Sequence, residues 1–210
     1  MNNLKTLIIQ PKEYFKWTKD EKTEKREPIK LKYLFMVFIA VSVINGVVQY
    51  LIAPDLVADM GIPGIGQTEL IIFQCVINIG GPLIGALIYV NILYLVSKIF
   101  MKIFEKKEIE DKKYFKNLLY FRYIVVGIVN IILAILFNCI LNDNQTVIIV
   151  SLINNLFVKL WATYILYSIF KYYVETEKVH KILPIILYIF TIIGTIMSVA
   201  STVLATIIPM

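Results

Sequence analysis

Five runs of about 20 or more mostly apolar residues, separated by charged or turn-rich stretches, dominate this 210-residue chain. A helix of about 20 apolar residues is long enough to cross the hydrocarbon core of a bilayer. The runs cover residues 31–53, 69–97, 118–141, 146–170 and 182–208. The apolar share of 59% and the mean hydropathy of +0.75 exceed those of soluble domains. The sequence therefore predicts an all-α, polytopic membrane protein with five transmembrane helices in one bundle.

The cations between the runs predict the orientation of the helices. All but two of the 21 Lys and Arg residues lie in 5–32, 98–116 and 171–181, whereas the connections 54–68 and 142–145 contain none. Cytoplasmic connections of membrane proteins carry an excess of Lys and Arg. We therefore expect the amino terminus inside, the carboxy terminus outside, and the three basic segments on the cytoplasmic side.

Residues 1–30 are expected to form a cytoplasmic basic segment and linker ahead of a five-span transmembrane domain over 31–210. An apolar helical stripe includes Leu4, Leu7, Ile8, Pro11 and Phe15. Largely off this stripe lie four lysines, Lys5, Lys12, Lys16 and Lys19. The pattern predicts a helix on the inner leaflet with these lysines at the membrane surface. The alternative is a loose basic tail, because Pro11 interrupts a helix unless a second helix starts there.

The fourth run contains a lysine, Lys159, near its middle. A lysine at the centre of a membrane helix costs about 2.5–3.5 kcal/mol on insertion scales, so it should face protein or water. Ser151 and Asn155 share its helical face, Asn154 lies beside them, and Asn78 in the second run could meet that stripe. These residues form a candidate intramembrane site for an anion such as a lipid phosphate. The alternative is a lysine capped by Asn and carbonyl oxygens, or one whose amine is uncharged.

Gly80-Gly81-Pro82 lies in the middle of the second run. Proline and glycine can break a helix and expose its carbonyl groups, as in some transporters. Gly81 and Gly85 also form a pattern of small residues four positions apart, which favours close helix packing. Close packing is the interpretation that we favour.

Chemistry-bearing motifs are missing from the sequence. The single histidine, His180, has no HExxH, GxSxG or cysteine partner, and both cysteines, Cys75 and Cys139, lie inside apolar runs. The sequence therefore predicts neither an enzyme, a metal site nor a cofactor. Nucleic acid is not expected as a partner, because the cations are clustered between spans and do not line a continuous groove with stacking aromatics.

Certain segments resemble a known family. They are Leu4-Lys5-Thr6-Leu7-Ile8-Ile9-Gln10-Pro11 with Phe15 after it, Trp161 followed by Ile165-Leu166, and Lys178 with Lys181 before the last run. Together with five spans and an inside amino terminus, they resemble the Yip-domain family of Ypt/Rab-interacting membrane proteins and its bacterial members. The resemblance implies a helical membrane protein without known catalysis, associated in eukaryotes with vesicle traffic and membrane shaping. The Ile-, Lys- and Asn-rich composition is typical of an AT-rich bacterial genome.

We therefore expect a non-enzymatic scaffold or accessory protein that is multi-pass in a bacterial cytoplasmic membrane. Its basic cytoplasmic faces would engage anionic lipid or a membrane protein partner. The alternative is a small transporter, channel or lipid-translocating protein with an anion site at Lys159. Five spans are few for a monomeric carrier, so this alternative implies a homo-oligomer.

Overall fold

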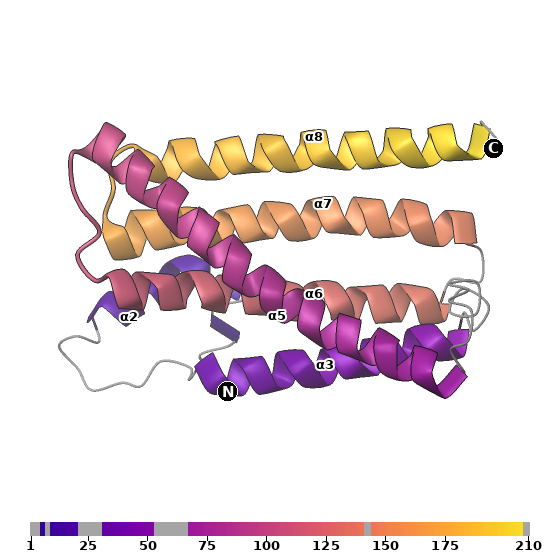
Figure 1. Cartoon of the computed structure of the whole chain (residues 1–210). Coiled ribbons are helices and arrows are strands. Elements are labelled where there is room, and N and C mark those ends of the chain that lie inside the picture. Colours follow the sequence, from indigo (N-terminus) through magenta and orange to yellow (C-terminus); the bar gives the residue numbers. More distant parts are fainter. Residues whose placement is uncertain (1–4, 7–8, 21–30, 53–66, 141–143, 208–210) are drawn as a thin grey trace. The chain divides into compact units, whose positions relative to one another are not determined.

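The computed structural model describes residues 5–6, 9–20, 31–52, 67–140 and 144–207 (Figure 1). The described elements are α2 (Pro11–Asp20), α3 (Leu31–Ile52), α5 (Gln67–Phe100), η1 (Met101–Glu105), α6 (Lys112–Ile140), α7 (Asn144–Ser168), η2 (Ile169–Val174) and α8 (Val179–Ile207). All of them are helical, and five of the helical segments are long and apolar enough to cross a membrane. The prediction of an all-helical, multi-pass membrane protein is confirmed at this level.

The helices extend beyond the apolar runs at the charged connections. The helix predicted to end at residue 97 continues as a π-helical turn to Glu105, and the one predicted to end at 170 continues in the same way to Val174. The reason is that hydropathy marks only the part suited to hydrocarbon, whereas long charged side chains in the next turns reach water. At the start of α6, the Asp111 carboxylate accepts the Tyr114 N–H at 2.9 Å and caps the helix.

Two compact units make up the chain. One, which we call the terminal unit, comprises Met1–Arg26, Ser97–Ile109 and Leu152–Met210. The other, the central unit, comprises Glu27–Val96 and Glu110–Ser151. The predicted boundary at residue 30 lies outside the described residues.

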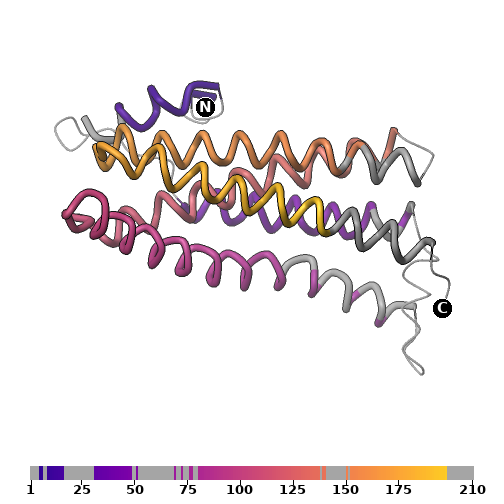
Figure 2. Tube along the Cα trace, turned by 90° about the horizontal axis from the view of Figure 1, so that it is seen from above, coloured from indigo at the N-terminus to yellow at the C-terminus, as the bar shows by residue number. Residues whose placement is uncertain are grey.

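In the central unit, α3 and α6 lie side by side (Figures 1 and 2). Their contact depends on Gly127, because a Cβ added there would lie 2.8 Å from the ring of Phe38, which is 2% exposed. The ring thus occupies space that any other residue at position 127 would need.

The glycines of α5 behave differently from one another. The helix runs without interruption from Gln67 to Phe100 with Pro82 inside it, so the Gly80-Gly81-Pro82 sequence does not end the helix. A Cβ at Gly85 would lie 3.0 Å from the Tyr123 hydroxyl, but one at Gly81 would meet nothing within 4 Å. Close packing is therefore found at Gly85 and not at Gly81.

In the terminal unit, α2 packs on η2. Pro11 is the first residue of α2, where its missing N–H is not needed, so the helical interpretation is confirmed for residues 11–20. Tyr14 and Phe15 are 2% and 0% exposed and pack edge to face, with ring centroids 5.3 Å apart. We predicted that the apolar stripe of this helix lies on a membrane surface. Its described part, Pro11 and Phe15, is instead buried in the protein, because the α2–η2 contact already removes it from water.

The carboxylate of Glu105, at the end of η1, caps the start of α8. It accepts the backbone N–H groups of Glu177, Lys178 and Val179 at 3.1, 2.7 and 2.9 Å. An anion at a helix amino terminus is favourable, because the first N–H groups of a helix have no partner inside it. This contact fixes the end of η1 against the start of the last membrane helix.

Candidate functional site

Three lysine amines converge on one aromatic ring in the terminal unit. The Nζ atoms of Lys12 and Lys16, from α2, lie 5.8 and 5.7 Å from the centroid of the Tyr172 ring. Lys171 Nζ, from η2, lies 5.4 Å from the same centroid. Cations are attracted to the negative face of an aromatic ring, which accounts for their approach to Tyr172. We call Lys12, Lys16, Lys171 and Tyr172 the lysine cluster.

The lysine cluster has an excess of positive charge. Within the described part of the chain, no carboxylate lies at ion-pair distance from the three amines. Lys12 and Lys16 are exposed and Lys171 is half-buried, so an external anion has access to them. All three amines lie within 5.8 Å of the centroid of one uncharged ring, which attracts them without neutralising their charge. The arrangement is chemically suited to a phosphate or another anionic group.

Tyr167 links the lysine cluster to aromatic side chains of α7 and α8. Lys171 Nζ donates a hydrogen bond to the Tyr167 hydroxyl at 2.7 Å. The Tyr167 ring stacks on Tyr164, with centroids 6.2 Å apart, and meets the His180 ring edge-on at 5.3 Å. A continuous set of aromatic rings thus runs from the lysine cluster onto α7 and α8.

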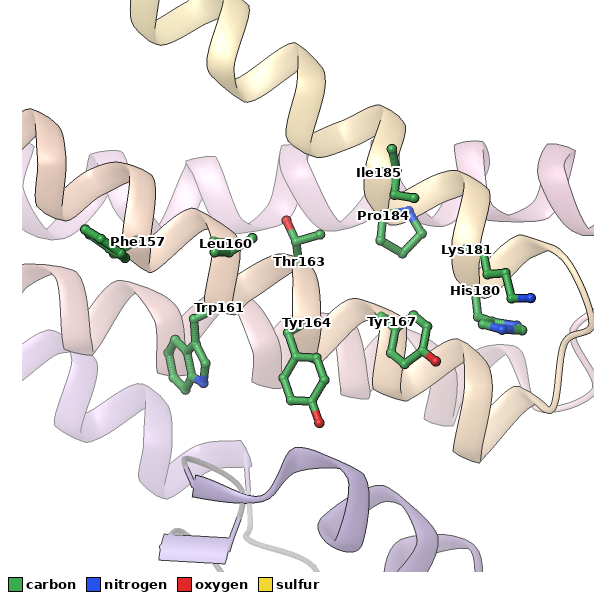
Figure 3. Close-up of a pocket in the computed structure, with 10 residues that line it drawn as sticks. All are labelled: Phe157, Leu160, Trp161, Thr163, Tyr164, Tyr167, His180, Lys181, Pro184 and Ile185. Carbon is green, nitrogen blue, oxygen red and sulfur yellow. The ribbon is translucent and has the colours of Figure 1, made fainter.

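These rings border a groove of about 640 Å³ between α7 and α8 (Figure 3). Phe157 lies at one end of it, and His180 and Lys181 lie at the other end beside Tyr167. Leu160 and Ile185 line the stretch between the two ends. The exposed lining of the groove is therefore apolar, and we call the end beside His180 and Lys181 its polar end because these two residues carry the polar side chains nearest to it.

His180 is 5% exposed, and its contacts are with Thr176, just before the start of α8. Its Nδ1 donates to the Thr176 carbonyl at 2.7 Å, since a carbonyl can only accept, and its backbone N–H donates to Thr176 Oγ1 at 3.0 Å. Pro184, one turn further along α8, has no N–H to offer the His180 carbonyl. These contacts give His180 a structural position at the polar end of the groove. Among the described residues, no group of three or more His, Cys, Asp or Glu side chains is placed to hold a metal ion.

The predicted anion site around Lys159 is only partly described. Lys159 is exposed on α7, and its carbonyl accepts the Thr163 hydroxyl at 2.8 Å. Asn154 and Asn155 are half-buried. The side chains of Ser151 and Asn78 lie outside the described residues. The prediction that Lys159 faces protein or water, and not lipid, therefore stays a prediction.

The predicted surface lysines fall into two groups. Lys12 and Lys16 belong to the lysine cluster, and Lys5 is exposed on the short helical segment before α2. The side chain of Lys19 lies outside the described residues. The sequence alone did not identify Lys171 or Tyr172 as site residues. The sequence places Lys171 next to Tyr172 at the end of the fourth run. Tyrosine is common at membrane interfaces, so this pair did not indicate a binding site.

Two cations of the central unit, Arg122 and Lys116, have polar partners. Arg122, 7% exposed on α6, donates from Nη1 to the Tyr89 hydroxyl at 2.8 Å. Lys116 donates to Asn91 Oδ1 at 2.8 Å, and its Nζ lies 4.7 Å from the Tyr94 centroid. These contacts join α6 to α5, so we assign both cations to the packing of the central unit.

Comparison with protein-family models, with curated proteins and with solved structures finds no match for this chain.

Proposed function

We propose that this chain is a non-enzymatic scaffold or accessory protein of a bacterial cytoplasmic membrane that binds anionic lipid at its basic cytoplasmic side. It would be a bacterial-type relative of the Yip-domain proteins, which its sequence resembles. The observation that carries the proposal is the lysine cluster, in which three amines converge on Tyr172 without a described carboxylate partner. Clustered lysines next to membrane helices attract the phosphate groups of anionic lipids.

A second observation supports a common side for the basic segments. The positive-inside rule assigns residues 5–32, 98–116 and 171–181 to the cytoplasm. In the terminal unit, α2 from the first segment packs on η2, and Glu105 from the second segment accepts N–H groups of Glu177 and Lys178 in the third. These contacts bring parts of all three segments together, which supports the proposal that they share one side of the membrane.

Native mass spectrometry of the purified full chain in detergent tests the proposal. The protein is mixed with equal amounts of phosphatidylglycerol and phosphatidylcholine that carry the same acyl chains, and the lipids bound per chain are counted. We expect the wild type to retain phosphatidylglycerol preferentially. In the triple variant Lys12→Gln, Lys16→Gln, Lys171→Gln, we expect phosphatidylglycerol binding to fall by at least about tenfold.

The matched control replaces three exposed lysines elsewhere, Lys107→Gln, Lys112→Gln and Lys113→Gln, and so removes the same net charge. We expect this control to keep most of the phosphatidylglycerol binding. Equal losses in the two triple variants would mean that net charge, and not the lysine cluster, governs lipid binding. Equal retention of the two lipids by the wild type would contradict the proposal outright.

One observation favours the alternative function, an oligomeric transporter or lipid-translocating protein. Lys159 is exposed near the middle of the helical segment formed by α7 and η2, where a lysine facing hydrocarbon is unfavourable. A second copy of the chain that covers this face would remove that cost. Under this alternative, Lys159→Met abolishes anion flux or lipid translocation in proteoliposomes, whereas wild-type vesicles that show neither process contradict it.

A further inference from the structure

The groove between α7 and α8 offers an apolar surface with a lysine residue beside one end, an arrangement that suits a phospholipid molecule. Its apolar stretch extends from Phe157 to Tyr167 on α7, which at 1.5 Å per residue is about 15 Å of helix. Leu160 and Ile185 lie along this stretch, and the one charged lining residue, Lys181, lies at the polar end with His180 (Figure 3). A ligand that fills the groove must therefore be apolar, and an anionic group at the end beside Lys181 would be favoured by charge.

The polar end of the groove is continuous with the lysine cluster. Tyr167 lines the groove, and its hydroxyl accepts a hydrogen bond from Lys171 at 2.7 Å. Lys171 in turn belongs to the lysine cluster. A phosphate held by these amines would thus have the mouth of the groove beside it.

We infer that the groove holds one acyl chain of an anionic phospholipid whose phosphate lies between Lys171 and Lys181. This inference rests on the proposed function. It extends that function, because it assigns one bound lipid per chain to a defined site and not to a charged surface in general. Charge and apolar surface together favour this occupant. A free phosphate would leave the apolar groove unfilled, and a neutral lipid would lack the anionic group that the lysines attract. Lipids that merely surround the helices would show neither a fixed stoichiometry nor a preference for the anionic headgroup.

The chain carries its own reporter, because Trp161 lines the groove. The chain has two tryptophans, and Trp17→Phe removes the other one. This variant is titrated in detergent with phosphatidylglycerol whose acyl chains are brominated, since bromine quenches tryptophan fluorescence on contact. We expect quenching that levels off at one lipid per chain, that unbrominated phosphatidylglycerol reverses, and that brominated phosphatidylcholine reproduces only weakly.

A matched control moves the reporter to the outside of α8. Phe190 is 67% exposed and does not line the groove, so Trp17→Phe, Trp161→Phe, Phe190→Trp reports contact with bulk lipid. We expect this reporter to be quenched without saturation and equally by both lipids. The same unsaturable behaviour at Trp161 would overturn the inference.

A second variant separates the groove from the lysine cluster. Thr163 lines the groove, so Thr163→Phe in the Trp17→Phe background fills part of it. We expect Trp161 to lose its saturable quenching while native mass spectrometry still counts bound phosphatidylglycerol. Phosphatidylglycerol that binds to the unfilled chain without quenching Trp161 would refute the inference and leave the proposed function intact. Failure of the unfilled chain to prefer phosphatidylglycerol at all would refute both.

Discussion

Replacing Glu105 by alanine tests how much the Glu105 cap at the start of α8 contributes to stability. The variant leaves three backbone N–H groups without their acceptor. Those of Glu177 and Lys178 belong to exposed residues and can bond to water, whereas Val179 is 0% exposed. A buried N–H left without a partner costs about 1–3 kcal/mol. The lost attraction between the carboxylate and the amino terminus of α8 adds about 0.3–1 kcal/mol.

We therefore expect Glu105→Ala to lower the free energy of unfolding by about 2–3 kcal/mol. Glu105→Gln keeps one acceptor oxygen but loses the charge, so we expect a smaller loss of about 1 kcal/mol. Unfolding in mixed micelles with increasing dodecyl sulfate, followed by circular dichroism, measures both changes. The control is Glu108→Ala, which removes an exposed carboxylate from the same connection. If Glu105→Ala and Glu108→Ala unfold at the same dodecyl sulfate fraction, the capping argument is refuted.

Three further substitutions are measured by the same unfolding experiment. Gly127→Ala should lower the free energy of unfolding by about 1–3 kcal/mol, because its Cβ would lie 2.8 Å from the buried ring of Phe38. Gly194→Ala meets nothing within 4 Å and should raise it by up to about 1 kcal/mol through helix propensity, so equal stability of the two alanine variants would contradict the packing argument. Lys106→Gly should raise stability by about 1 kcal/mol, because Lys106 has the left-handed φ of 54°, and an unchanged unfolding midpoint would show that this residue carries no strain.

The membrane helices could be predicted from the sequence because the bilayer imposes length and apolarity on each one separately. Their ends could not be predicted as well. Residues 101–105 and 171–174 are helical although they include charged residues, since local backbone hydrogen bonding continues where the hydrophobic requirement stops. Hydropathy therefore located the helices and underestimated their reach at the charged connections.

The candidate site could be predicted only in part. Lys12 and Lys16 were identified from the helical pattern of the amino-terminal segment, as residues at a membrane surface. Their convergence with Lys171 on Tyr172 depends on α2 packing against η2, a contact between segments far apart in the sequence. The groove likewise arises from side chains of two helices, so neither helix alone contains its pattern.

The division of the lysine cluster between two segments has a consequence for ionic conditions. Lys12 and Lys16 belong to α2, whereas Lys171 belongs to η2, so the three positive charges are close together only while α2 is packed. Their mutual repulsion opposes packing, and it weakens as salt shortens the Debye length from about 30 Å at 0.01 M to about 10 Å at 0.1 M. A bound anion offsets the same repulsion, and by reciprocity every anion that prefers the packed state favours packing by the same factor. Hydrogen exchange of the α2 amides should consequently be fastest at low ionic strength without anionic lipid. The packing of α2 would thus respond to both the salt concentration and the anionic lipid content of the membrane.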